Sequence, residues 1–464
     1  MEKKEQEVSG KRSLFSSNLG FMLAAIGGAV GLGNIWAFPF KLGRGGGFPF
    51  LLIYVIFVFV LAIPMTLAEY SFGRRSRCGP VQAYRNLSKK WSFVGWINMA
   101  VCVGVMGFYC LICGWILKYL CMFALSCVGM GGEFWTMDSA EYFSMFIASP
   151  VEPLIWTALF MVINYLVVRN NIASGIEKSC KVMIPVLVAI MVIVAVRSCT
   201  LPGASEGLAY LFEPNATAFQ ENGGFFAILT LALLQVFFSS NIGFGTNLMY
   251  GSYMTDDSSI TRSAIVVPIA NTIVAILASL ATIPAVFAFG YEPSSGAGML
   301  FITLKAVFET MPGGAFFGFI FFIAVFFAAL SSTIGMTAAI AAHPVDNWGW
   351  KERKASFVSS VIPVLIAIPI SLGYGIWSHV RPLAFLGKET DLLDSLDFLC
   401  ENCLATTAAL MLCIFIGWVW KPDAVIEEVE KSGPFTWKKL FTIAIRYVCP
   451  IITLIAMLSS IGIL

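Results

Sequence analysis

The sequence carries little charge and almost no histidine. Asp, Glu, Lys and Arg make up 12% of its 464 residues, while 58% of the residues are hydrophobic. Soluble domains average about 25% charged residues, so this composition excludes an ordinary water-soluble protein. The two histidines, His343 and His379, belong to no nucleophile–base pair and no metal-ligand pattern. We therefore expect a lipid-embedded protein that is not an enzyme and that binds no nucleic acid.

The sequence has twelve cysteines, yet no disulfide is expected. Most of them lie in or beside apolar blocks, including the two C-x-x-C pairs Cys110/Cys113 and Cys400/Cys403. A metal or redox site would need histidines or carboxylates at matching spacing, and none accompany these pairs. We interpret both pairs as parts of apolar helices.

What the sequence does have is a series of long apolar blocks. Each block is long enough to cross the roughly 30 Å of hydrocarbon in a bilayer, and no connection is long enough to build a core of its own. The first block follows a short tail without a small-residue cleavage site, so we expect a retained helix and not a removed signal peptide. The blocks predict eleven transmembrane helices near residues 20–42, 48–73, 93–126, 153–169, 179–197, 225–253, 263–290, 313–342, 357–373, 392–420 and 441–464.

The distribution of Lys and Arg predicts how the chain crosses the membrane. Cytoplasmic connections of membrane proteins are rich in Lys and Arg. One predicted connection carries six basic residues between Arg74 and Lys90, whereas segment 127–152 carries four acidic residues and no basic one. We therefore expect a multi-pass protein of the plasma membrane, with its N-terminus in the cytoplasm and its C-terminus outside.

Two of the predicted spans are interrupted by glycines and side-chain amides. The first span contains GGAVGLGN at 27–34, and the sixth contains SSNIGFGTN at 239–247. Close helix packing explains the glycines, but it does not explain Asn34, Asn241 and Asn247. Unwound backbone at this depth occurs only where it is buried in protein or lines a polar cavity. We therefore predict that both helices unwind at the bilayer midplane.

The positions of these two spans predict the architecture. They are the first and the sixth, so spans 1–5 and 6–10 form two five-helix repeats of opposite orientation. Such a pair of broken helices indicates a midplane binding site, where freed carbonyls coordinate a cation and half-helix N-termini attract a carboxylate. The predicted units are a cytoplasmic tail (1–19), the first repeat (20–200), an outer loop (201–224), the second repeat (225–420) with an outer re-entrant or surface segment (291–312), and an inner loop with the last helix (421–464).

Polar residues in other spans accompany the breaks. Ser331 and Ser332 in the eighth span supply hydroxyl oxygens of the kind that complete a cation shell. A carboxylate inside a span marks a functional position. Glu69 is predicted to accept hydrogen bonds from the unwound backbone of both broken spans, and Asp397 lies near the outer end of the tenth span.

These residues resemble the neurotransmitter:sodium symporter family, particularly its eleven-helix, leucine-transporter-like bacterial branch. The resemblance covers essentially the whole chain. Its most specific element is AVGLGNIW at 29–36, followed by Phe38-Pro39. Further matching elements are the glycines at 45–47, Pro64 with Glu69, Gly73-Arg74, and QVFFS at 235–239 before Gly243-Phe244-Gly245.

The resemblance implies a substrate site and two sodium sites between the broken helices. The first sodium site would use Ala29, Asn34, Ser239 and Asn271. The second would use Gly27, Val30, Ala328, Ser331 and Ser332. The substrate would be bound by backbone groups of Ala29, Gly31, Leu32 and Gly33 and by the hydroxyl of Tyr109, and its side-chain pocket would be lined by Val105, Phe238, Asn241, Phe244, Thr333 and Met336.

The resemblance also implies the class of substrate. Members that carry biogenic amines have an aspartate where this chain has Gly31. The glycine leaves room for the carboxylate of an amino acid. The chain is therefore expected to be a sodium-coupled symporter that imports an amino acid, with a neutral and apolar side chain, by alternating access.

The implied cytoplasmic gate uses Arg12, Tyr253 and Asp346. In the family these positions form a network that closes the inner path. Phe15 and Asn18 depart from the pattern, because the family usually has Trp and Arg there. We expect a looser inner latch than in other members.

The implied outer gate lacks one of its partners. The family pairs an arginine with the acid at Asp397, but Ala37 stands at the arginine's position. Asp397 then either has another partner or leaves closure to the packing of Tyr109 and Phe244. Ala275 stands where bacterial members carry the carboxylate that substitutes for chloride, so chloride dependence stays open.

Other interpretations of the sequence also stay open at this point. An unpaired Asp397 would favour a substrate with a cationic side chain. A non-transporting sensor of the same fold would bind an amino acid without moving it, although the short tails offer little output surface. The identity of the amino acid, the sodium stoichiometry and the oligomeric state are left open by the sequence.

Overall fold

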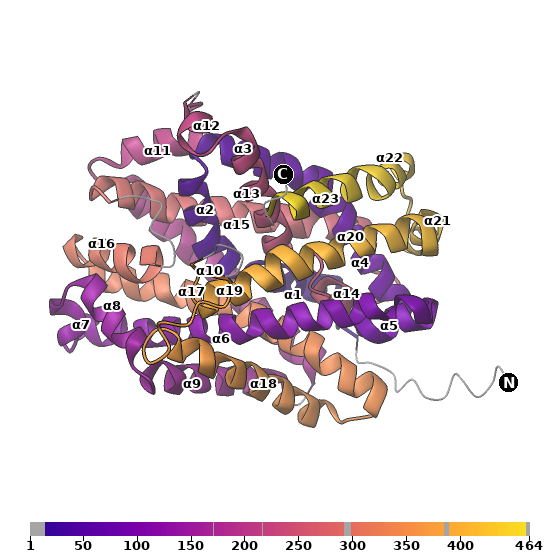
Figure 1. The fold of residues 1–464 in the computed structure, drawn as a ribbon, viewed down its shortest axis with the longest axis horizontal. Helices are drawn as coiled ribbons and strands as arrows, with labels where there is room; N and C mark the ends of the chain where they lie inside the picture. The colour runs from indigo at the N-terminus through magenta and orange to yellow at the C-terminus, as the bar shows by residue number, and fades with distance from the viewer. Residues whose placement is uncertain (1–13, 170, 216, 292–297, 385–388, 461–464) are drawn as a thin grey trace.

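The computed structural model describes residues 14–169, 171–215, 217–291, 298–384 and 389–460, and within these ranges its regular structure is entirely helical. Figure 1 shows long helices lying side by side across the molecule and short helices gathered at its two ends. One end carries α7 (Glu133–Thr136), α8 (Ser139–Ala148), α11 (Ala204–Phe212), α12 (Ala218–Glu221) and α16 (Leu304–Thr310), and the other carries α5 (Pro80–Leu87), α21 (Pro422–Glu430) and α22 (Lys438–Ile443).

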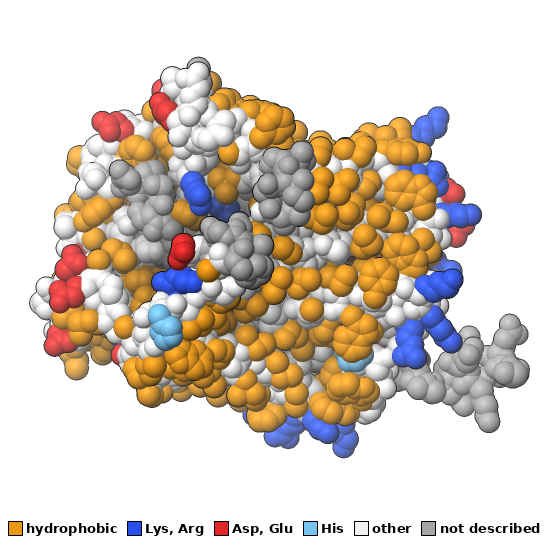
Figure 2. Space-filling model, in the orientation of Figure 1, with side chains coloured by type: hydrophobic (Ala, Val, Ile, Leu, Met, Phe, Trp, Pro, Cys, Tyr) orange, Lys and Arg blue, Asp and Glu red, His pale blue; other side chains and the backbone are white. Residues whose placement is uncertain are grey.

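Within the described ranges, eight helical stretches are long and apolar enough to cross a membrane, or ten if each of two strongly bent pairs is one span. They are Phe48–Ser76 (α3, η2, α4), Lys89–Cys127 (η3, α6), Ile172–Cys199 (α10), Ile260–Ala288 (α15), Gly314–Trp348 (α17), Glu352–Leu372 (α18), Leu392–Trp420 (α19, η6, α20, η7) and Lys438–Ser460 (α22, η8, α23). They coincide with predicted spans 2, 3, 5 and 7 to 11. Figure 2 shows their hydrophobic side chains covering the middle of the molecule. The predicted all-helical, multi-span membrane protein is confirmed.

The two predicted helix breaks are also confirmed. The first span consists of α1 (Asn18–Ala29) and the stretch Gly33–Arg44 (η1 and α2), which are bent by 51° relative to each other. The sixth span consists of α13 (Phe225–Ser239) and α14 (Thr246–Ser252). The interruptions, at 30–32 and 240–245, fall inside the two glycine- and asparagine-containing segments.

The break in the sixth span has a backbone cause. Asn241, Gly243 and Gly245 have φ values of 52°, 84° and 78°. These values lie in the left-handed region, which glycine enters without steric cost and asparagine tolerates better than most residues. A right-handed helix cannot continue through such residues, so α13 ends and α14 starts in a new direction.

The fourth span and part of the segment 291–312 form helices that meet or pack against neighbouring helices. The fourth span is α9 (Glu152–Val168), which meets α8 at an angle of 81°. Of segment 291–312, residues 292–297 lie outside the described residues, and the part that follows forms η4 (Met299–Thr303) and α16. Because α16 packs against α17, this part of the segment lies on the helix bundle.

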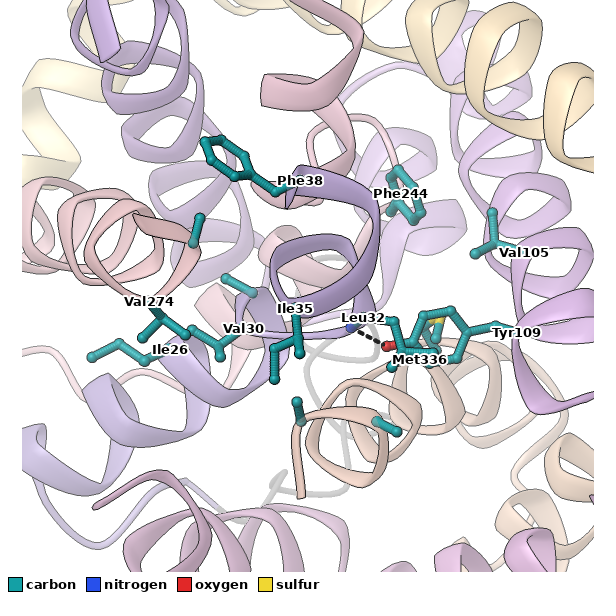
Figure 3. Packing of buried hydrophobic residues seen from close by; sticks show 14 of the residues in the cluster. Ile26, Val30, Leu32, Ile35, Phe38, Val105, Tyr109, Phe244, Val274 and Met336 are labelled. Carbon is teal, nitrogen blue, oxygen red and sulfur yellow. Dashed lines mark hydrogen bonds between the residues drawn. The ribbon is translucent and has the colours of Figure 1, made fainter. Parts of the chain in front are cut away.

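The first broken helix lies inside the bundle. Helix α1 packs against α10, α14, α15 and α17, and α14 in turn packs against α4. Phe21 and Ala24 of α1, and Val30 at the break that follows it, are fully buried. Figure 3 shows Ile26 of α1 and Val30 of the break beside Val274 of α15. The break at the end of α1 therefore faces protein and not lipid.

The contact between α4 and α14 gives a prediction about stability. A Cβ atom added to Gly73 would lie 2.0 Å from the carbonyl oxygen of Leu248, so the two backbones touch. We expect Gly73→Ala to push α14 outward and to cost about 1–3 kcal/mol of stability, as overpacking does. The midpoint of thermal unfolding in detergent should fall. Gly417→Ala is the control, because its nearest neighbour lies at 3.4 Å; equal midpoints for both variants would contradict the expectation.

Candidate functional site

The two helix breaks lie against each other and are joined by hydrogen bonds. Asn241 Nδ2 donates to the carbonyl of Gly28 at 2.7 Å, and Gln235 Nε2 donates to the carbonyl of Gly33 at 2.8 Å. Ser332 Oγ of α17 donates to the same Gly28 carbonyl at 3.3 Å. Carbonyls at a helix end lack helical donors, and these side chains supply donors on both sides of the α1 break. The breaks therefore form one polar junction inside the bundle.

Glu69 of α4 fixes the chain between α13 and α14. Its side chain is 2% exposed, and its carboxylate accepts from Gly243 N at 3.3 Å and from Asn247 Nδ2 at 2.8 Å. Asn247 Nδ2 also donates to the carbonyl of Ser240 at 2.8 Å. A buried carboxylate is stable only with such partners. The sequence predicted such bonds with the unwound backbone of both broken spans, and among the described residues the hydrogen bonds of Glu69 run to the sixth span.

The residues expected at the first sodium site meet at the end of α1. Asn34 Nδ2 donates to the carbonyl and the Oδ1 of Asn271 at 2.8 and 2.7 Å, and Ser239 Oγ lies 2.9 Å from the hydroxyl of Tyr54. Ala29 is the last residue of α1, where carbonyls lack helical donors. Among the described residues, the buried Oδ1 of Asn34 has no hydrogen-bond partner. An orphaned buried acceptor costs roughly 1–3 kcal/mol, and neutral oxygens are ligands that suit an alkali cation.

The residues expected at the second sodium site lie between α1 and α17. Ser331 Oγ is 3.0 Å from the carbonyl of Ala328 and 3.4 Å from the carbonyl of Val30. A Cβ on Gly27 would lie 3.3 Å from the Cβ of Ser331, so Gly27 also faces this point. The hydroxyl of Ser332 instead turns toward the α1 break. The structure therefore gathers Gly27, Val30, Ala328 and Ser331, with Ser332 bridging to the neighbouring cavity.

A cavity opens between the two breaks. It is lined by Gly28, Ala29, Gly31, Gly33, Val105, Tyr109, Phe238, Ser239, Asn241, Phe244, Thr246, Tyr250, Ser332, Gly335 and Met336. Every residue predicted for the substrate site lines it except Leu32 and Thr333. The Thr333 hydroxyl donates to the carbonyl of Leu330 in its own helix. The sequence prediction missed Gly28, Thr246, Tyr250 and Gly335.

Gly31 lies against Ser332 and Tyr109 in the lining of this cavity. A Cβ added there would lie 2.4 Å from Ser332 Oγ and 2.8 Å from the hydroxyl of Tyr109. The Tyr109 hydroxyl accepts from Leu32 N at 2.9 Å, as the dashed line in Figure 3 shows. The absence of a side chain thus keeps the backbone of the break open toward Tyr109.

Tyr250 of α14 could be found only from the tertiary structure. A Cβ on Gly28 would lie 2.6 Å from its ring, and a Cβ on Gly335 would lie 2.5 Å from its hydroxyl. Two glycines from different helices therefore make room for one ring. Each glycine in the sequence gives no sign of which side chain approaches it.

The residues expected at the cytoplasmic gate are only partly brought together. Arg12 lies outside the described residues. The carbonyl of Tyr253 accepts from Phe15 N at 3.2 Å, and the two rings lie edge to face with centroids 5.9 Å apart. Asp346 Oδ2 accepts from Gly79 N at 2.7 Å, which ties the end of α17 to the start of α5.

At the outer gate, Asp397 has a neighbouring acid and a cation. Its side chain is hydrogen-bonded to Glu401, one turn later in the same helix, and the charge of Lys41 acts on both carboxyl groups. The Lys41 ammonium also lies 5.5 Å from the centroid of the Phe238 ring, which lines the cavity. The family has its arginine at the position of Ala37. Sequence reasoning missed Lys41 because it lies one helical turn after that position.

The fold is that of a helical multi-span membrane protein with a cavity between two broken helices. The model of the sodium:neurotransmitter symporter family matches residues 12–128 and 132–463. The chain belongs to this family, and it is a sodium-dependent transporter and not an enzyme.

Individual relatives support this assignment over the full length. An uncharacterized sodium-dependent transporter of Bacillus subtilis, YhdH, is 35% identical over 97% of this chain and 98% of its own. A similar protein of Haemophilus influenzae is 29% identical over the same shares. The crystal structure of MhsT in complex with L-phenylalanine is similar with a TM-score of 0.88 and 35% identity, covering 97% of this chain and 100% of that one.

The outer cluster of Lys41, Asp397 and Glu401 gives a prediction about stability that can be tested without a substrate. We expect Lys41→Ala to remove the cation that offsets the two acids and to lower stability by about 1 kcal/mol. Glu401→Gln in the Lys41→Ala background should restore most of the loss, because one acid then remains. Thermal unfolding in detergent measures both changes. Arg44→Ala, an exposed charge on the same helix, is the control; a loss that Glu401→Gln does not reverse would contradict the interpretation.

Proposed function

We propose that this chain is a sodium-coupled symporter that imports a neutral amino acid with an apolar side chain by alternating access. The observation that carries the proposal is the cavity between the two breaks, which combines open backbone at Gly31 with the orphaned oxygen of Asn34 nearby. A substrate carboxylate placed there completes the shell of a sodium ion. Sodium and substrate then stabilise each other's binding, which is the basis of coupling.

The lining of the cavity supports an apolar substrate side chain. Val105, Phe238, Phe244 and Met336 present hydrophobic surface to it. Asn241 adds little polarity, because its Nδ2 is used by the carbonyl of the α1 break. The relative MhsT, in whose crystal structure L-phenylalanine is bound, fits the same expectation.

The outer gate counts against the cationic alternative. That alternative required an unpaired acid near the entrance. Lys41 acts on both Asp397 and Glu401 and places a positive charge beside Phe238. A substrate with a cationic side chain would meet this ammonium on its way into the cavity.

We propose two sodium ions per substrate, one at the cluster of Asn34 and one at the cluster of Ser331. Both clusters offer neutral oxygens, as an alkali ion needs, and Ser332 connects the second cluster to the cavity. Each sodium charge that moves inward along a potential of 100 mV supplies about 2.3 kcal/mol. Ala275 is fully buried and brings no carboxylate to the first cluster. The experiments below therefore compare binding with and without chloride.

The proposed orientation has the N-terminus in the cytoplasm and the C-terminus outside. Figure 2 shows Lys and Arg side chains gathered at the end of the molecule that carries α5, α21 and α22. Acidic side chains gather at the opposite end, near α7 and α8. This asymmetry supports a cytoplasmic location of the basic end in the plasma membrane. The repeats at 20–200 and 225–420 would move against each other to expose the cavity to either side.

The first test of the function is a thermal-shift screen of the twenty amino acids in sodium and in potassium. We expect stabilisation by neutral, apolar amino acids in sodium, because a ligand that binds only the folded state stabilises it by about 2.7 kcal/mol at 100 times its Kd. The screen is repeated with chloride replaced by gluconate. Equal shifts in sodium and potassium would contradict coupling, and binding without sodium-driven uptake into proteoliposomes would favour the sensor alternative.

The second test concerns Gly31. We expect Gly31→Ala to lower substrate affinity at least about tenfold, because its Cβ has to displace Ser332 Oγ or the Tyr109 hydroxyl. Scintillation proximity binding of the amino acid found in the screen measures the affinity. Gly417→Ala, which adds a methyl group far from the cavity, is the control. Unchanged affinity in Gly31→Ala would place the carboxylate elsewhere.

A further inference from the structure

Glu177 of α10 reaches across to the start of α1. Its carboxylate accepts from Ser16 N at 2.8 Å and from the hydroxyls of Ser16 and Ser17, the latter at 3.3 Å. The side chain is 4% exposed. In addition to the packing of α1 against α10, this carboxylate binds the two residues just before α1, and the gate residues expected from the sequence did not include it.

The local sequence is shaped for this contact. A Cβ added to Gly20 would lie 2.0 Å from Glu177 Oε1, so the carboxylate rests directly against the backbone of α1. Ser17 is the N-cap of this twelve-residue helix, and its hydroxyl accepts from Gly20 N at 3.0 Å. The N-terminal end of a helix carries a partial positive charge, which favours a carboxylate there.

Two further contacts concern the segment that Glu177 binds and the ion pair that Glu177 makes within α10. On the other side of the same segment, Phe15 donates its N–H to the carbonyl of Tyr253 and stacks near Tyr250. On α10 itself, Lys181 Nζ lies 2.7 Å from Glu177 Oε1. Because Lys181 is one turn away in the same helix, this ion pair survives if α1 departs. The charge of Glu177 is therefore never left unpaired.

We propose that Glu177 is the latch that keeps the cytoplasmic end of α1 against α10 and so closes the inner path. This inference rests on the alternating-access function proposed above. When α1 swings about its break at 30–32, the bonds from Ser16 and Ser17 to Glu177 break together, and the second sodium cluster opens to the cytoplasm. Glu177 is a positioning residue: it acts on the path through α1 and touches neither ion nor substrate.

A native cysteine reports this opening. Cys180 lies one turn after Glu177, is fully buried, and has a free thiol. A Cβ on Gly27 would lie 2.8 Å from its Sγ, so the thiol faces α1 beside the second sodium cluster. Departure of α1 uncovers Cys180 and makes its thiol available to a maleimide.

The experiment measures the alkylation rate of each cysteine by N-ethylmaleimide in the full-length protein, using peptide mass spectrometry. We expect Glu177→Ala to raise the rate at Cys180 about tenfold, as the loss of hydrogen bonds to a charged group would, and Ser16→Ala to raise it less. The buried cysteines Cys110 and Cys413 should react as slowly as before, because they belong to α6 and α20, whereas α1 packs mainly against α10, α14, α15 and α17. Glu177→Ala combined with Ser16→Ala should add little to Glu177→Ala alone.

The matched control is Glu352→Gln. Glu352 is also a carboxylate at this end of α10, where its Oε2 accepts from Ile172 N at 3.1 Å, so it binds the start of α10 and serves as a carboxylate contact outside the proposed latch. An unchanged rate at Cys180 in Glu177→Ala would overturn the latch. An equal rise in Glu352→Gln, or a rise at all buried cysteines, would also overturn it, because general loosening of α10 would then suffice.

The outcome for the latch is independent of the outcome for the function. The alkylation assay needs no substrate, so it tests Glu177 even if no amino acid is taken up. If sodium-dependent uptake is found and the rate at Cys180 does not respond to Glu177→Ala, the latch fails and the symporter stands. If Cys180 responds and uptake is absent, the hinge of α1 is real and the transport proposal fails.

Discussion

Backbone carbonyls that lack helical donors in the middle of a membrane protein are the constraint on which this structure depends. Such groups are costly in hydrocarbon, so the breaks in the first and sixth spans must lie inside the bundle and must meet polar partners. Asn241 and Gln235 provide these partners across the junction, and Glu69 provides them for the chain between α13 and α14. Once the breaks are held in this way, a cavity with open backbone follows.

The surrounding helices hold the junction and also limit its movement. Helix α1 lies among α10, α14, α15 and α17, and α14 touches the backbone of α4 at Gly73. Both halves of the first span pack against α15, whereas the halves of the sixth span pack against different helices, α13 against α3 and α14 against α4. The cation and carboxylate proposed to bind between them would change which of these contacts are most favourable, and this is the proposed physical link between binding and movement.

Polar groups at the two ends of the path are arranged differently from what the family pattern implied. At the outer end, Lys41 takes up a position one turn beyond Ala37 and acts on two acids. At the other end, Glu177 holds the first turn of α1 together with the packing of Phe15. At the outer end a cation one turn along the helix thus stands near the acid that the family pairs with an arginine.

The sequence by itself determined the helical membrane fold, both breaks and most of the cavity lining. Apolar length fixes the spans, and glycines with asparagines in mid-span leave few alternatives to unwound backbone. Only the tertiary structure decided that Thr333 bonds within its own helix, that Tyr250 enters the cavity between Gly28 and Gly335, and that Lys41 stands beside Asp397. These facts depend on the direction in which each side chain leaves its helix and on which neighbour has no Cβ, and such directions are set by packing among distant segments.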